Sequence, residues 1–135
     1  MSSAVHDAPP TIPPFAIERF TGLGRCEELR VSGELDMIGS RSLAEALARA
    51  SEEGRDVIVD LNSCVFIDST GVAAIIFGAR RLDARGRRLR LLIPEKGQPQ
   101  RQLKLLGIAD SPLACASRED ALLDFRTQGQ PEMQL

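Results

Sequence analysis

Residues 57–71, which read Val-Ile-Val-Asp-Leu-Asn-Ser-Cys-Val-Phe-Ile-Asp-Ser-Thr-Gly, decide the fold class. The apolar beginning of this stretch is typical of a strand that is buried on both faces of a sheet. An apolar pattern with helical spacing follows at once and predicts a helix over residues 69–84. Ser69 is thereby placed at a helix N-terminus, where unpaired N–H groups and the positive end of the dipole favour a phosphate.

The segments on either side predict further elements in alternation. We expect strands near residues 15–20, 28–32, 89–93 and 113–116, and helices from Ser40 or Ser42 to just before Gly54, over residues 98–106, and after Ser117. Gly33 opens a loop that contains Glu34, Leu35 and Asp36, and Ser42 with Glu45 fits a capping box. Leu103 and Leu106, and later Leu122 and Phe125, are expected to face inward. The order predicts an α/β fold with a mixed sheet of four or five strands and about four helices.

Length and composition indicate one globular domain. The chain has 135 residues, of which 43% are apolar and 27% charged. We expect a flexible proline-rich arm at residues 1–14, the domain at 15–127 and a polar tail at 128–135. The net charge of −2 gives no general attraction to nucleic acid or anionic membranes. Without a membrane-length apolar run or a signal-like N-terminus, the chain is expected to be cytoplasmic.

The residues needed for enzyme chemistry are missing from the pattern around Ser69. A serine nucleophile needs a base, but the only histidine is His6 in the arm, and the lysines, Lys96 and Lys104, lie far along the chain. The three cysteines are widely spaced and form no CxxC pair, so we expect reduced thiols. No metal-ligand cluster or phosphate-binding loop is recognisable. We therefore expect neither an enzyme, nor a metal, nor a cofactor.

Two motifs have structural as well as functional interpretations. The tetrapeptide Asp68-Ser69-Thr70-Gly71 could serve only as a helix cap, with Gly71 allowing close packing. Residues 80–90 contain six arginines and one aspartate, Asp83. This run is either a patch for nucleic acid or phospholipid, or the solvated end of a helix followed by a turn.

The combination of Gly33-Glu34-Leu35-Asp36, Asp60-Leu61 and Phe66-Ile67-Asp68-Ser69-Thr70-Gly71 resembles the STAS domain. Within that family it is most similar to the bacterial anti-sigma factor antagonists. The resemblance runs from about residue 15 to residue 125 and implies a STAS-like fold. It also implies that Ser69 is phosphorylated, with Thr70 ranked well below it, and that Asp36 and Asp68 border the acceptor. The expected partner-binding residues are Asp36, Asp68, Ser69, Thr70 and Gly71.

The resemblance further implies a switch between partners. The unphosphorylated protein would bind an anti-sigma factor with GHKL-type serine kinase activity and so release the sigma factor. Phosphorylation would end that complex, and a separate serine phosphatase would restore it. We expect no nucleic-acid or membrane partner, and a monomer or weak dimer.

Two other functions remain open at this point. The chain could be a non-switching STAS adaptor subunit of a transporter or of a lipid-export ATPase complex, although such a scaffold has no need of the retained serine. Weak nucleotide binding by the domain itself has less support, because no phosphate-binding motif is present.

Overall fold

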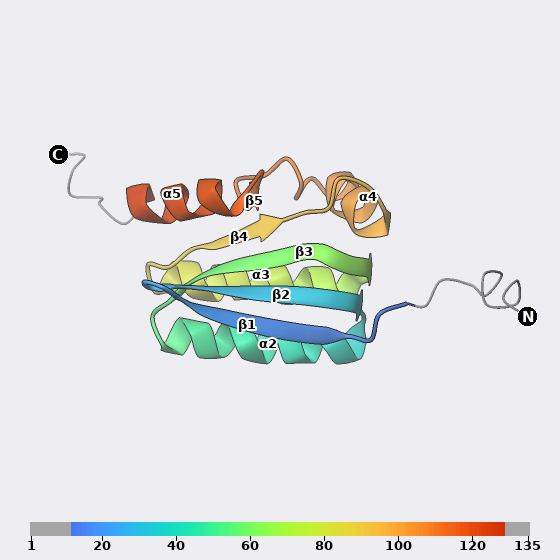
Figure 1. The fold of residues 1–135 in the computed structure, drawn as a ribbon, viewed down its shortest axis with the longest axis horizontal. Helices are drawn as coiled ribbons and strands as arrows, with labels where there is room; N and C mark the ends of the chain where they lie inside the picture. Colours follow the sequence, from blue (N-terminus) through green and yellow to red (C-terminus); the bar gives the residue numbers. More distant parts are fainter. Residues whose placement is uncertain (1–11, 129–135) are drawn as a thin grey trace, which may run out of the picture.

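Five strands form one mixed sheet in the order β1-β2-β3-β4-β5 in the computed structural model, which describes residues 12–128 (Figure 1). The strands are β1 (Ala16–Leu23), β2 (Cys26–Leu35), β3 (Asp56–Ile67), β4 (Leu89–Leu92) and β5 (Ala114–Cys115). The first two are antiparallel and the other neighbours are parallel. The helices of the described part are α2 (Met37–Glu52), α3 (Ser69–Ala84), α4 (Gln98–Leu105) and α5 (Arg118–Gln128). The predicted α/β fold with a mixed sheet is confirmed.

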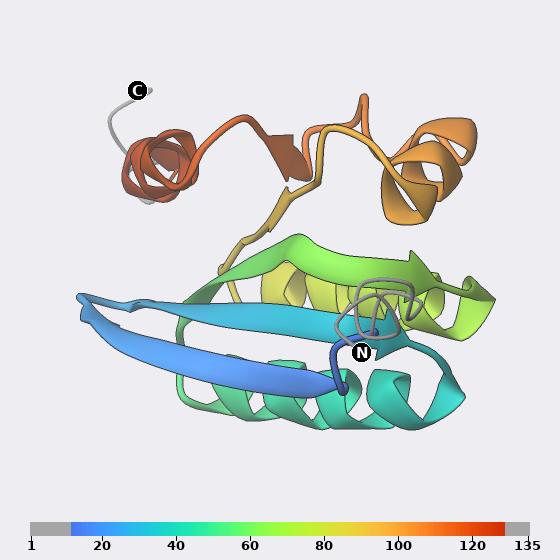
Figure 2. The ribbon, with the colours of Figure 1, turned by 45° about the vertical axis from the view of Figure 1, so that its right-hand side comes forward.

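The helices lie on both faces of the sheet. Figures 1 and 2 show α2 and α3 side by side behind one face, with α4 and α5 beyond β4 and β5. The main core lies between the sheet and the pair α2 and α3. Gly78 lets these helices approach closely, because an added Cβ would lie 2.4 Å from Leu47 Cδ1. A smaller core under α5 contains Cys26, Ile58, Leu92, Ala121 and Phe125.

Helix α3 has the bounds predicted for it, residues 69–84. Its buried face includes Val72, Ile75 and Leu82, while Ile76 and Ala79 are half-buried at its side. The apolar spacing of 3 and 4 residues explains why this segment is helical and which face it buries. Helix α3 therefore carries Ser69 at one end and the arginine-rich run at the other.

The loop predicted after Gly33 and the predicted start of the first helix are both wrong. Residues 33–35 continue β2 and pair with β3, and Leu35 lies opposite Ile67. The helix begins directly afterwards, with Asp36 as its N-cap instead of Ser40 or Ser42. Asp36 serves as the N-cap because its Oδ1 accepts hydrogen bonds from the N–H groups of Ile38 and Gly39, at 3.1 and 3.0 Å. Ser40 lies one turn inside the helix and is buried.

The remaining elements follow the prediction with one exception. Helix α4 ends at Leu105 and buries Leu103, but Leu106 is 50% exposed instead of facing inward. Leu106 is the C-cap, where the helical repeat stops, so it no longer shares the face of Leu103. Ser117 caps α5 by accepting a hydrogen bond from the Asp120 N–H at 3.1 Å, and Phe125 is buried as expected.

Apart from residues 12–14 and 128, the predicted arm, with His6, and the predicted tail lie outside the described residues. Among the helices between residues 12 and 128, none has the length and apolar character needed to cross a bilayer.

Candidate functional site

Two equivalent strand-to-helix junctions lie next to each other at one end of the sheet. Leu35 at the end of β2 pairs with Ile67 at the end of β3, and the Asp68 N–H donates to the Leu35 carbonyl at 3.3 Å. Asp36 and Asp68 come next along the two parallel strands, and each is the N-cap of the helix that follows. The N-termini of α2 and α3 therefore lie side by side, and each is capped by its own aspartate.

Asp68 uses its carboxylate to satisfy the start of α3. Its Oδ1 accepts hydrogen bonds from the Thr70 hydroxyl at 2.5 Å and from the N–H groups of Thr70 and Gly71 at 2.9 and 3.2 Å. The Thr70 hydroxyl is the main reason why the pKa of Asp68 lies below its ordinary value, with the backbone N–H groups adding to it. These two N–H groups are thus already paired, contrary to the expectation from the sequence that they face a phosphate.

Ser69 and Thr70 differ in how available their hydroxyls are. Ser69 is the first residue of α3 and is exposed, and its side chain forms no hydrogen bond with any other residue between 12 and 128. Thr70 is half-buried, and its hydroxyl bonds to Asp68 and lies 3.1 Å from the Ser40 hydroxyl of α2. Ser40 in turn donates to the Asp36 carbonyl at 2.6 Å. The Thr70 hydroxyl is therefore part of the joint between the two helices, while the Ser69 hydroxyl faces solvent.

Gly71 is buried where the two junctions meet. An added Cβ would lie 2.8 Å from Ile67 Cγ1 and 2.9 Å from the Leu35 carbonyl oxygen, which is too close for a side chain. A glycine at this position lets α3 begin directly against the ends of β2 and β3.

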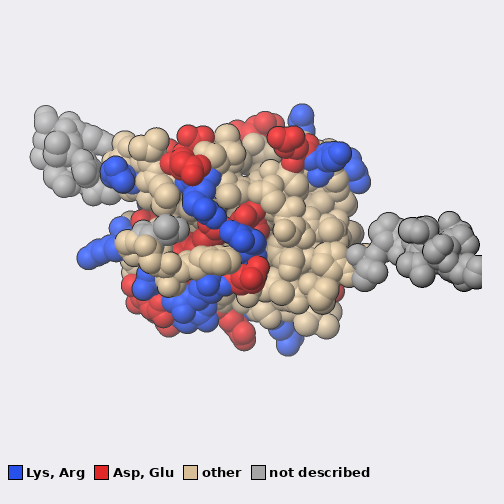
Figure 3. Space-filling view, viewed as in Figure 1, with Lys and Arg blue, Asp and Glu red and all other residues tan. Residues whose placement is uncertain are grey.

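Exposed apolar side chains surround the helix starts. Met37 and Ile38 form the first turn of α2 and are 64% and 75% exposed. Val65 and Phe66, close to the end of β3, are also exposed. Seen from the side opposite α2 and α3, uncharged side chains cover the carboxyl ends of β2 and β3, on the right in Figure 3. Sequence reasoning missed Met37 and Ile38, although Leu35-Asp36 repeats the Ile67-Asp68 pattern and could have located this helix start.

Gln98, the first residue of α4, binds the end of β3 along the edge that does not pair with β2. Its Oε1 accepts a hydrogen bond from the Ile67 N–H at 2.8 Å, and its Nε2 donates to the Ile67 carbonyl at 2.9 Å. No local sequence signal indicates this contact, because the two residues are 31 positions apart.

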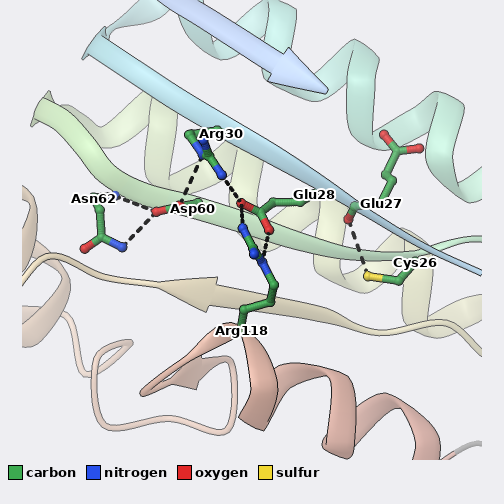
Figure 4. A network of polar contacts seen from close by, with 7 residues as sticks. All are labelled: Cys26, Glu27, Glu28, Arg30, Asp60, Asn62 and Arg118. Atoms are coloured by element: carbon green, nitrogen blue, oxygen red, sulfur yellow. Dashed lines mark hydrogen bonds and ion pairs between the residues drawn. The ribbon is translucent and has the colours of Figure 1, made fainter. Parts of the chain in front are cut away.

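On the face of the sheet away from α2 and α3, a polar network connects α5 to β2 and β3 (Figure 4). The fully buried Glu28 accepts hydrogen bonds from Arg118 Nε and Nη2, at 2.6 and 3.0 Å, and from Arg30 at 3.1 Å. Burial alone would raise the pKa of Glu28, but these hydrogen bonds outweigh it and hold the pKa below its ordinary value. The network is structural and lies away from Ser69.

The groups that could hold a metal or act as reactive thiols are not gathered at this site. Between residues 12 and 128, no three His, Cys, Asp or Glu side chains lie close enough together to bind a metal ion. Cys26 and Cys64 are buried free thiols, and Cys115 is a half-buried one.

A family model described as "Mlab, STAS domain" matches residues 19–114. No curated protein sequence matches the chain. The Bacillus anti-sigma factor antagonist SpoIIAA, in its unphosphorylated form, superposes with a TM-score of 0.69 at 23% identity, over 83% of this chain and 97% of that one.

Two further solved structures share the fold. An anti-sigma factor antagonist from Mycobacterium paratuberculosis gives a TM-score of 0.67 at 20% identity, over 84% of this chain and 93% of that one. The murine anion transporter Slc26a9 gives 0.60 at 16% identity, over 76% of this chain and 18% of the transporter. The common fold is thus found both in free-standing regulators and inside a transporter.

Proposed function

Because the chain belongs to the STAS domain family, we propose that it is an anti-sigma factor antagonist controlled by phosphorylation of Ser69. In this proposal the unphosphorylated protein binds an anti-sigma factor with GHKL-type serine kinase activity and releases the sigma factor. A serine phosphatase reverses the modification. The protein itself is a non-enzymatic regulator of the cytoplasm, and the chemistry is done by its partners.

The observation that carries the proposal is the position of the Ser69 hydroxyl. It lies on the first residue of α3, is exposed, and forms no side-chain hydrogen bond within the described residues. A kinase can therefore reach it without unfolding the helix start. The Thr70 hydroxyl is already bonded to Asp68 and Ser40, so its phosphorylation would break the joint between α2 and α3.

The surface around Ser69 has the properties of a docking face. We define the docking face as three of the predicted partner-binding residues, Asp36, Asp68 and Ser69, together with Met37 and Ile38. The other two predicted residues, Thr70 and Gly71, lie in the joint between the two helix starts. The two apolar side chains are exposed at the start of α2, beside the start of α3. Exposed apolar groups of this kind gain free energy when a partner removes them from water, at about 25 cal/mol per Å².

Phosphorylation would change this face by charge and not by unfolding. A phosphate adds about −1.5 to −2 charges beside the carboxylates of Asp68 and Asp36. The dipole of α3 offsets typically about 0.3–1 kcal/mol of the repulsion, and the exposed phosphate keeps its water in the free protein. At a docked interface that water is lost, and a penalty of about 3–4 kcal/mol would weaken binding a few hundredfold.

A kinase assay tests the acceptor directly. The protein is incubated with the GHKL-type kinase of its own genome that co-purifies with it, together with ATP, and the phosphate is located by mass spectrometry. We expect one phosphate on Ser69. The matched control is Ser42→Ala, because Ser42 is another exposed helical serine near the start of α2.

Two variants test whether Ser69 is the acceptor. Ser69→Ala should accept no phosphate, while Ser42→Ala should be labelled as the wild type is. Unlabelled wild-type protein, or undiminished label in Ser69→Ala, would contradict the proposal.

A second candidate function is supported by the comparisons. The matching family model is described by the name Mlab, and the same fold occurs within the Slc26a9 transporter. The chain would then be a constitutive adaptor subunit of a transporter or lipid-export ATPase complex. Co-purification with a membrane ATPase that is equally strong for wild type, Ser69→Ala and Ser69→Asp would favour this function over the switch.

A further inference from the structure

A groove of about 460 Å³ lies between the C-terminal half of α3, the beginning of β4 and the segment before β5. This volume is within the range of small-molecule sites, about 300–1,000 Å³. Its apolar wall consists of Ile76, Ala79, Leu89, Pro112 and Leu113. Most of the wall packs against the main core, so the groove is formed before any ligand arrives.

Four arginines and one carboxylate, Asp83, line the rest of the groove, and three of the arginines are already paired. Nε of Arg87 lies 3.5 Å from Asp56 Oδ1, and Nη1 of Arg88 donates to Asp83 at 2.9 Å. Arg90 pairs with Asp124 of α5, with 3.1 Å between Nε and Oδ2.

Arg80 differs from the other arginines of the groove. It is exposed, and its guanidinium makes no ion pair or hydrogen bond with another residue between 12 and 128. The groove thus combines an apolar wall with one guanidinium whose hydrogen-bond donors are available to a ligand.

We propose that this groove binds one molecule of a single-chain amphiphile, with its alkyl chain along the apolar wall and its anionic head group on Arg80. Charge complementarity selects an anion, because four arginines line the groove against one carboxylate, Asp83, which is already paired with Arg88, while Arg80 is paired with no residue between 12 and 128. A nucleic acid fits less well, since the residues that line the groove include no aromatic ring for base stacking.

The groove is separate from the proposed phosphorylation site. Arg80 follows Ser69 by eleven residues on the same helix, which corresponds to roughly 16 Å along its axis. Amphiphile binding therefore does not depend on the switch, and each can fail without the other.

The test uses the whole protein and a series of alkyl phosphates below their micellar concentrations. Binding of inorganic, hexyl, octyl and decyl phosphate is measured by isothermal titration calorimetry. Chemical shifts of the amides of Ile76, Ala79, Leu89 and Leu113 report the place of binding. We expect one site, with affinity rising about fourfold for each added methylene until the wall is covered. Inorganic phosphate should bind more weakly than every alkyl phosphate.

Two charge reversals form a matched pair for this test. Arg80→Glu should weaken binding of the alkyl phosphates about tenfold or more. Arg81→Glu changes the net charge equally but lines a different groove, between α2 and α3, and should leave binding unchanged. Both residues are exposed, so thermal midpoints should stay close to that of the wild type.

Several outcomes would overturn the proposal. These are absence of saturable binding, equal affinity for inorganic and decyl phosphate, an equal loss in both charge reversals, or shifts elsewhere than in the groove. Tighter binding of a single-stranded oligonucleotide that displaces decyl phosphate would also overturn it, in favour of a nucleic-acid site.

Discussion

The side-chain amide of Gln98 lies against the backbone of Ile67 where a neighbouring strand would otherwise lie. Its two hydrogen bonds, at 2.8 and 2.9 Å, satisfy both the N–H and the carbonyl of Ile67. Strand β4 pairs with β3 only as far as Asp60, so the end of β3 has no strand neighbour on that side. The first residue of α4 thereby fixes the strand end that leads into Asp68 and Ser69.

Gln98→Ala should destabilise the protein by about 1–3 kcal/mol, because it leaves a buried N–H and carbonyl unpaired. Urea unfolding measures the loss, and hydrogen exchange of the Ile67 amide should accelerate. Gln100→Ala, on the same helix and without a side-chain hydrogen bond to any residue between 12 and 128, should stay within about 0.5 kcal/mol of the wild type. Equal stability of the two variants would show that the pairing contributes nothing.

Asp68→Ala should lower the free energy of unfolding by about 0.5–2 kcal/mol, because it removes the N-cap of α3. Asp68→Asn should lower it less. The pKa of Asp68 is lowered on folding, chiefly by the Thr70 hydroxyl, so the charged form stabilises the fold at neutral pH. That contribution is lost as the pH falls through the folded-state pKa, in the acid range. Urea unfolding from pH 7 down to pH 2 should show the difference between wild type and Asp68→Asn shrinking. The exposed Asp110→Asn serves as the control, and a difference independent of pH would contradict the assignment.

Arg118→Ala should destabilise the fold by about 1–3 kcal/mol, because Glu28 stays buried with Arg30 as its remaining hydrogen-bond partner. Arg118→Lys should recover only part of the loss, since it cannot form both hydrogen bonds. Arg126→Ala, on the exposed side of the same helix, should stay within about 0.5 kcal/mol of the wild type. Chemical denaturation gives all three values, and an unchanged Arg118→Ala would mean that α5 is held by its apolar contacts alone.

The cysteines should differ in reactivity in the folded state. Burial, followed by the charge of Asp56, raises the pKa of Cys26 to about 12, and burial also raises that of Cys64. Burial, followed by the charge of Asp124, raises the pKa of Cys115 as well, but this thiol is only half-buried. At pH 8 iodoacetamide should therefore modify Cys115 first, while the other two thiols are protonated and inaccessible. In denaturant all three should react at similar rates. Rapid modification of Cys26 in the native protein, located by mass spectrometry, would contradict its burial.

The parts of the fold set by local patterns could be predicted from the sequence. The sequence predicts helix α3 at its observed bounds because an apolar repeat follows an aspartate cap without interruption. The start of α2 could not be placed, because Ser42 and Glu45 mimic a capping box one and a half turns inside the helix. The choice of Asp36 depends on the pairing of Leu35 with Ile67, which no local pattern contains.

The candidate site also has one part that local sequence predicts and another that depends on long-range contacts. A hydroxyl at the start of a helix could be located from the sequence, and Ser69 is exposed there. The contact of Thr70 with Ser40 and that of Gln98 with Ile67 join residues about thirty positions apart. Such contacts arise only when the sheet has assembled, so single-sequence periodicity does not reveal them.

The affinity of the protein for the proposed anti-sigma factor kinase, before and after phosphorylation of Ser69, tests the central claim most directly. Calorimetry should show tight binding of the unmodified protein and binding weaker by a few hundredfold after stoichiometric phosphorylation, which corresponds to about 3–4 kcal/mol. The thermal midpoint of the free protein should shift by no more than about a few degrees. Equal affinity of the two forms would contradict the account.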